Sequence, residues 1–205
     1  MNWELIISFI GATSALAVSP GPDNIYVLVQ SMVNGKNAAM ATVSGLITGC
    51  IVHTSLLAFG ISAVIKRNES VYLAIKIFGA LYLVFLAYKV YREGSKISFT
   101  ANVKQQKNLM ELYAQGFLMN VLNPKVTIFF LAFFPAFLFH KEWSTEIQFF
   151  ILGGVFMLTS FIIFSMIALF ASSIKSYTIN HPKSGLIFKW LQILVFLGIA
   201  IFILL

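Results

Sequence analysis

Two charged side chains of opposite sign, Asp23 and Lys125, lie deep within long apolar segments of this 205-residue sequence. A charge at the centre of a membrane helix costs about 2.5–3.5 kcal/mol on insertion scales, and such residues are functional candidates. A carboxylate suits an ammonium group and a lysine suits a carboxylate, whereas an amino acid carries both groups. We therefore expect Asp23 to face the α-ammonium of an amino acid and Lys125 to face its α-carboxylate.

Two other roles remain open for these charges. Asp23 and Lys125 could neutralise each other as a buried structural pair. Asp23 could also bind and release a proton, which is compatible with transport because a protonatable carboxylate can couple export to a proton gradient.

Each charge directly follows an expected helix break. Pro20, Gly21 and Pro22 cannot continue a regular helix, because each proline removes an amide donor and clashes with the preceding turn. Pro124 interrupts the apolar segment that contains Lys125. It lies 102 residues after Pro22, which is close to half the chain. Discontinuous helices at matched positions in two halves are the best sequence pointer to a transporter's substrate site. Prolines that only kink the helices for packing are the alternative.

Uncharged polar residues accompany both breaks. Asn24 follows the first charge, and Asn120 and Asn123 lie one helical turn apart beside the second break. Backbone and side-chain polar groups at this depth must be buried in protein or face a watery cavity. We expect these three asparagines to line the substrate cavity.

The second apolar segment carries Gly45, Gly49 and His53 at intervals of four, so that the three share one helix face. A G-x-x-x-G pair lets another helix approach closely, either within one chain or between copies in a homo-oligomer. His53 on the same stripe points into the bundle. It is a second proton-coupling candidate, or else a histidine that hydrogen-bonds to a neighbouring helix.

The composition indicates that these residues lie in a lipid bilayer. Apolar residues make up 59% of the chain and charged residues 10%, against about 45–50% and 25% in soluble domains. This excludes a soluble enzyme, a disulfide scaffold and a disordered chain. With Cys50 as the one cysteine, an internal disulfide and a cysteine-based zinc site are excluded, and we expect no cofactor and no metal. The basic residues form no stripe with stacking aromatics, so nucleic acid is not expected as a partner.

The chain is expected to be an all-α integral membrane protein with six transmembrane helices, of which the first and fourth are interrupted by proline. A single domain is expected, with two inverted three-helix repeats at about 1–91 and 112–205. A basic cytoplasmic linker at about 92–111 joins them and can touch anionic lipid headgroups. The predicted spans are Leu5–Val33, Ala38–Ile65, Val71–Tyr91, Leu112–Phe139, Ile147–Ser172 and Leu186–Leu205.

Basic residues predict the orientation, because cytoplasmic loops carry an excess of lysine and arginine. Nine lie on one set of loops: Lys36, Lys89, Arg92, Lys96, Lys104, Lys107, Lys175, Lys183 and Lys189. Four lie on the other: Lys66, Arg67, Lys76 and Lys141. The first set is expected in the cytoplasm, and with six spans both termini are then outside.

The motifs at 20–23, 53 and 123–125, together with the chain length and the basic linker, form a recognisable set. On these motifs the chain resembles the LysE/RhtB family of bacterial amino-acid exporters, which includes lysine and homoserine/threonine exporters. The resemblance covers the whole chain. It implies a multi-pass protein of the bacterial inner membrane that expels amino acids or related compounds, driven by the proton gradient. The residues do not indicate which amino acid is carried.

Two other functions are alternatives to export. A cation transporter of the wider superfamily would need several acidic or soft ligands within the spans, where Asp23 is the only acidic residue at depth. A membrane enzyme could use Asp23 and His53 as an acid–base pair, but the sequence holds no hydrolase or metalloprotease motif. We therefore expect a transporter and not an enzyme.

Overall fold

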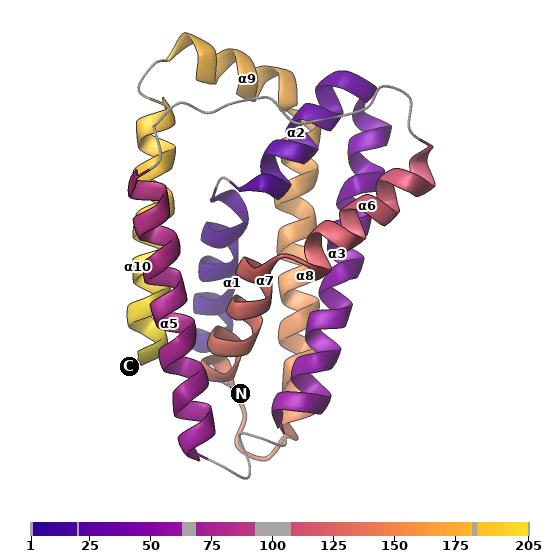
Figure 1. Cartoon of the computed structure of the whole chain (residues 1–205). Helices are drawn as coiled ribbons and strands as arrows, with labels where there is room; N and C mark the ends of the chain where they lie inside the picture. The colour runs from indigo at the N-terminus through magenta and orange to yellow at the C-terminus, as the bar shows by residue number, and fades with distance from the viewer. Residues whose placement is uncertain (1, 20, 63–68, 93–107, 182–183, 205) are drawn as a thin grey trace.

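The computed structural model describes residues 2–19, 21–62, 69–92, 108–181 and 184–204, and these ranges contain helices and no strand (Figure 1). The first half holds α1 (Trp3–Val18), α2 (Pro22–Asn34), α3 (Lys36–Leu56), the π-helical turn η1 (Leu57–Ile61) and α5 (Glu69–Arg92). The second half holds α6 (Leu109–Val121), α7 (Pro124–Ile128), the π-helical η2 (Phe129–Phe133), the 3₁₀ turn η3 (Phe134–Phe137), α8 (Thr145–Leu169), α9 (Ala171–Asn180) and α10 (Ser184–Leu204).

Four helical segments are long and apolar enough to cross a membrane alone: Lys36–Gly60, Ser70–Arg92, Thr145–Leu169 and Ser184–Leu204. Two further spans are bent pairs: α1 and α2 meet at 60°, and α6 meets the segment Pro124–Phe137 at 49°. The predicted all-helical membrane class is confirmed, with six spans when each bent pair counts as one. The relation of the halves as inverted repeats stays a prediction.

The helix breaks lie where the prolines predict them. Gly21 has extended backbone and precedes Pro22, which occupies the first turn of α2. Pro124 likewise opens α7 after Asn123. Proline is well suited to the first turn of a helix, because the amide that it lacks would have no intrahelical partner there. Pro20 lies outside the described residues, as does most of the predicted linker.

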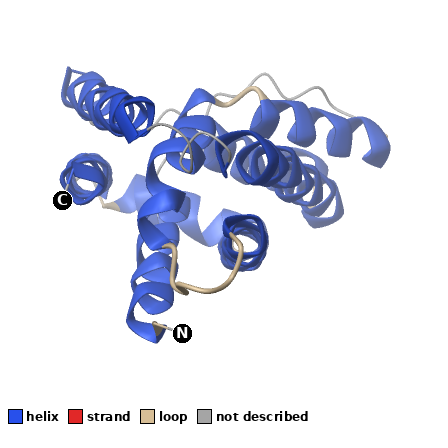
Figure 2. Ribbon diagram, turned by 90° about the horizontal axis from the view of Figure 1, so that it is seen from below, coloured by secondary structure: helices blue, strands red, loops and turns tan. Residues whose placement is uncertain are grey.

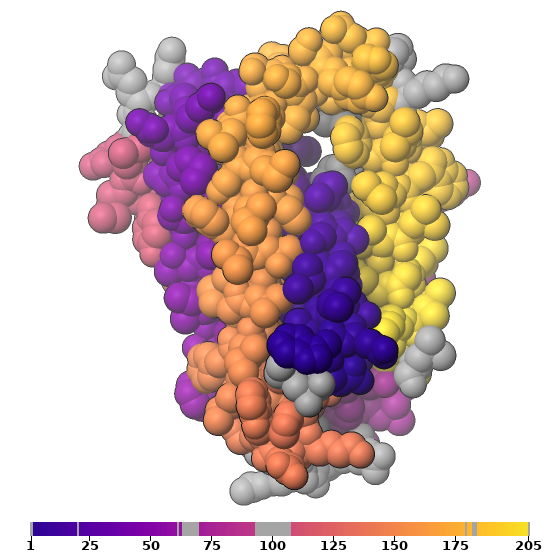
Figure 3. Space-filling model, turned by 180° about the vertical axis from the view of Figure 1, so that it is seen from behind, coloured from indigo at the N-terminus to yellow at the C-terminus, as the bar shows by residue number. Residues whose placement is uncertain are grey.

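The fifth span was predicted at about Ile147–Ser172, and its helix α8 ends at Leu169. The backbone leaves helical geometry at Phe170, and a separate helix, α9, begins at Ala171. Its sequence is largely polar, with four serine and lysine residues in its first six positions. A helix with this many polar residues is not suited to cross a bilayer, and α9 instead crosses the end of the molecule from α8 to α10 (Figures 1 and 3).

The helices form two side groups with the broken helices between them. α5 pairs with α10 on one side, while α3 packs against α6 and α8 on the other (Figure 2). Both chain termini lie at one end of the molecule, and α9 and the α2–α3 turn lie at the opposite end (Figure 1). Which end faces the cytoplasm stays a prediction.

A cluster of buried phenylalanines closes the interior on the terminal side of the breaks. Five of them come from η2 and η3: Phe129, Phe130, Phe133, Phe134 and Phe137. The ring of Phe9 on α1 packs against three of these, with centroid separations of 5.0–6.2 Å. Aromatic pairs at such separations add stability beyond the area they bury. The cluster therefore holds both broken helices in place beside their breaks.

Candidate functional site

Asp23 lies in the first turn of α2, immediately after the first break, and its side chain is buried. A carboxylate is favoured at this position by the partial positive charge of a helix N-terminus. The side-chain amide of Asn123 donates a hydrogen bond of 2.7 Å to Oδ2 of Asp23. Residues 100 positions apart in the sequence are thereby joined across the two breaks.

Asn123 is the N-cap of α7, and both ends of its side chain are used. Its Oδ1 accepts a hydrogen bond of 3.0 Å from the backbone amide of Lys125, which satisfies one of the free donors at the start of the helix. Its amide nitrogen donates to Asp23. The cap that starts the second half-helix therefore also orients the carboxylate of the first.

Lys125 follows this cap, and its side chain reaches toward the first break. Its Nζ lies 3.7 Å from the place that a Cβ on Gly21 would occupy and 5.2 Å from the ring centroid of Phe196 on α10. Lys125 and Asp23 interact electrostatically. Within the described residues they form no direct ion pair at 4.0 Å or less. The two charged groups thus lie near each other without direct contact.

Asn24 bridges the first break. Its side-chain amide donates a hydrogen bond of 2.7 Å to the carbonyl of Ala17 in the last turn of α1. An otherwise unpaired carbonyl at a helix C-terminus is thereby satisfied. Asn24 holds α1 to α2 across the bend, and one side of its side chain borders a pocket.

Asn120 and His53 lie together at the contact of α6 with α3. The Nε2 of His53 lies 3.1 Å from the carbonyl oxygen of Asn120, so this nitrogen carries a proton and donates it. The same carbonyl oxygen accepts a hydrogen bond of 2.9 Å from the backbone amide of Asn123. His53 is thus linked through one peptide group to the residue that binds Asp23. The side chain of Asn120 packs against Gly49 and Cys50, so its binding to a substrate stays a prediction.

Glycines allow α3 and α6 to approach closely. A Cβ on Gly45 would collide with the carbonyl oxygen of Tyr113, and one on Gly116 with the carbonyl oxygen of Thr42. A Cβ on Gly49 would stand 2.8 Å from Oδ1 of Asn120. Gly116 was missed in the sequence because it stands alone, outside any G-x-x-x-G pair. The signal in the sequence would have been a small residue, Gly116, in the segment expected to pack against the one that contains Gly45.

Known proteins are similar to this chain over most of its length. Residues 14–205 match the family model described as LysE type translocator. The chain is 26% identical to a homoserine/homoserine lactone efflux protein of Salmonella typhimurium, over 89% of this chain and 87% of the relative. It is 24% identical to an uncharacterized membrane protein, YrhP, of Bacillus subtilis, over 96% of each chain. No solved structure matches it.

Proposed function

Because the chain belongs to the LysE-type translocator family, we propose that it exports an amino acid or a close derivative across the bacterial inner membrane. The observation that carries the proposal is that Asp23 and Lys125 each follow a helix break and that Asn123 hydrogen-bonds to the Asp23 carboxylate and to the Lys125 backbone amide. Relatives named as homoserine/homoserine lactone efflux proteins support an amino-acid-like substrate and outward transport.

The charges provide complementary contacts for a zwitterion. Asp23 receives the α-ammonium group, while Lys125 receives the α-carboxylate. Each side chain can bind a group of the substrate without first breaking a direct ion pair, because the described Asp23 and Lys125 form none within 4.0 Å. A buried site in which the substrate completes the charge balance discriminates against ligands that lack either group.

Proton coupling involves Asp23 and His53. A proton on Asp23 removes the charge that attracts the ammonium group, so protonation and substrate binding compete at one carboxylate. His53 is connected to this carboxylate through the backbone of Asn120 and the side chain of Asn123. Protons entering from outside the cell would displace the amino acid outward. In this scheme both termini face outward and α9 lies at the cytoplasmic end.

Everted membrane vesicles test the proposal, with a panel of labelled amino acids and an imposed proton gradient. The parent is expected to accumulate at least one amino acid, and Asp23→Asn to reduce this accumulation by about tenfold or more, equivalent to about 1.4 kcal/mol. Glu142→Gln is the matched control, because Glu142 is exposed and lies in the loop before α8. Equal accumulation by Asp23→Asn and the parent would remove Asp23 from the mechanism. Accumulation of no amino acid by the parent would refute the function.

A further inference from the structure

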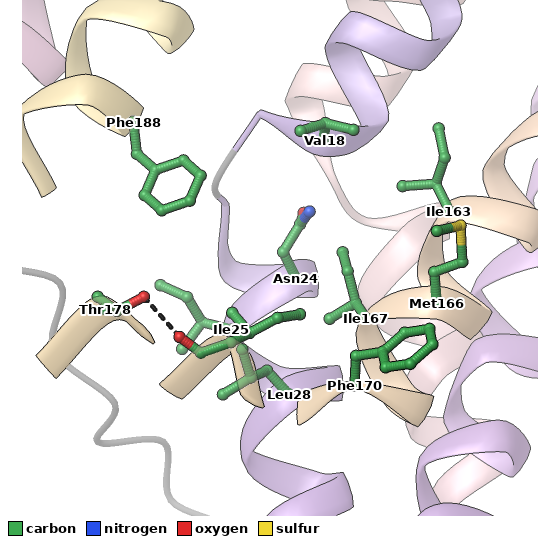
Figure 4. Close-up of a pocket in the computed structure, with 11 residues that line it drawn as sticks. Val18, Asn24, Ile25, Leu28, Ile163, Met166, Ile167, Phe170, Thr178 and Phe188 are labelled. Carbon is green, nitrogen blue, oxygen red and sulfur yellow. Dashed lines mark hydrogen bonds between the residues drawn. The ribbon is translucent and has the colours of Figure 1, made fainter. Parts of the chain in front are cut away.

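A pocket of about 400 Å³ lies beside the first break, beneath α9 (Figure 4). Residues of α1, α2, α8, α9 and α10 line it, and nine of the eleven are apolar. Small-molecule sites are usually apolar clefts of this size with a few polar groups that fix orientation. The pocket therefore has the dimensions and the chemistry of a binding site for an apolar group.

The two polar lining residues offer few hydrogen bonds to a ligand. The hydroxyl of Thr178 donates to the carbonyl of Ile174 at 2.8 Å, as the dashed line in Figure 4 shows. The amide nitrogen of Asn24 is already bonded to Ala17. Among the described residues no donor is bonded to Oδ1 of Asn24, so this oxygen is the polar atom left for a ligand. A polar side chain placed in the pocket would leave its own groups largely unpaired, which is unfavourable.

The pocket adjoins the charged site at Gly21, because a Cβ there would lie 3.7 Å from Nζ of Lys125 and 3.9 Å from Oδ1 of Asn24. Asn24, which borders the pocket, directly follows Asp23 in the first turn of α2. An amino acid whose ammonium group meets Asp23 can therefore extend its side chain past Asn24 into the pocket. We propose that this pocket binds the side chain of the exported compound, and that the substrate class is amino acids, or derivatives, with large aliphatic or aromatic groups. This inference rests on the proposed function.

The pocket also opens on the outer surface of the helix bundle, which we expect to face the bilayer. Val18, Met166 and Phe170 of its lining are 42%, 53% and 54% exposed. The space-filling view shows a hollow beneath α9, bordered by α8 and α10 (Figure 3). An apolar substrate is suited to such an opening, because it partitions into the bilayer as well as into the pocket. A phospholipid acyl chain is the competing occupant.

The test compares labelled phenylalanine, leucine and alanine in everted vesicles. Accumulation at subsaturating concentration is expected to be about tenfold or more higher for phenylalanine and leucine than for alanine, since each methylene in an apolar pocket contributes about that factor. Ile163→Trp, which fills the pocket, is expected to lower the accumulation of phenylalanine and leucine to that of alanine, whereas Leu158→Trp is expected to keep the preference of the parent. Leu158→Trp is the matched control, because Leu158 lies on the same helix and is 63% exposed.

Thermal unfolding monitored by circular dichroism shows whether the filled variant is folded, and Met166→Phe provides a milder filling variant at a more exposed position. Similar accumulation of all three amino acids by the parent, or a preference that survives filling, would overturn the pocket assignment alone. Accumulation of no amino acid would refute the proposed function and the inference with it. Loss of a copurifying phospholipid from Ile163→Trp, with transport unchanged, would assign the pocket to lipid and overturn the inference.

Discussion

Replacing Asn123 with alanine removes two interactions that join the broken helices. One is the 2.7 Å hydrogen bond to the carboxylate of Asp23, and the other is the 3.0 Å cap on the amide of Lys125. A hydrogen bond to a charged group contributes about 1.5–3 kcal/mol, and an N-cap contributes about 1 kcal/mol. We expect Asn123→Ala to lower the free energy of unfolding by about 2.5–4 kcal/mol.

Asn123→Ser separates the two contributions. Serine is as good an N-cap as asparagine, but its shorter side chain cannot span the distance to Asp23. The serine variant is therefore expected to lose the charged hydrogen bond only, and to be about 1 kcal/mol more stable than Asn123→Ala. Both variants are expected to reduce transport, because the carboxylate of Asp23 loses the group that orients it.

Unfolding of purified protein in detergent, monitored by circular dichroism, provides the assay. Asn108→Ala is the control, because Asn108 caps α6 with a 3.2 Å bond to the amide of Met110 and is exposed. This control is expected to lose about 1 kcal/mol. If Asn123→Ala is no more destabilising than Asn108→Ala, the hydrogen bond to Asp23 does not stabilise the protein. A double-mutant cycle with Asp23→Asn isolates the pairwise energy.

Helix packing and the hydrogen bonds of one loop give two further predictions. Gly45→Ala is expected to destabilise the protein by about 1–3 kcal/mol, because its Cβ would collide with the backbone of Tyr113. Gly154→Ala, which meets nothing within 4 Å, is expected to be neutral or to stabilise by up to about 1 kcal/mol, and equal thermal stabilities of the two would contradict this. Gln148→Leu leaves the backbone at 139–143 without four hydrogen bonds, so we expect faster amide exchange at 139 and 140 and a loss of at least about 2 kcal/mol. Unchanged exchange at these two amides would show that Gln148 does not hold the loop.

The spans and their breaks were predictable from the sequence, because both follow from local chemistry. Long apolar segments are stable in the bilayer. Proline interrupts a helix because it has no backbone N–H to donate to the preceding turn. The start of α2 at Pro22 and of α7 at Pro124 therefore agreed with expectation. The end of α8 at Leu169 was less predictable, because Phe170 and Ala171 are still apolar and the polar residues begin only at Ser172.

The connections within the site were less predictable than its members. Sequence placed Asp23, Asn123 and Lys125 beside two breaks, but not the hydrogen bond that joins Asp23 to Asn123. That bond depends on the register between the two half-helices, which is determined by tertiary packing such as the close approach of α3 to α6. The pocket beneath α9 was hidden for the same reason, since five helices contribute to its lining.

Recognition of a zwitterion requires Lys125 to bind the carboxylate of the amino acid. The direct measurement is calorimetric binding of a transported amino acid and of the amine that lacks its carboxylate, to the purified parent and to Lys125→Met. The parent is expected to bind the amino acid at least about tenfold more tightly than the amine, which corresponds to about 1.4 kcal/mol. In Lys125→Met this ratio is expected to fall close to one. The same ratio in both proteins would contradict the assignment of Lys125 to the substrate carboxylate.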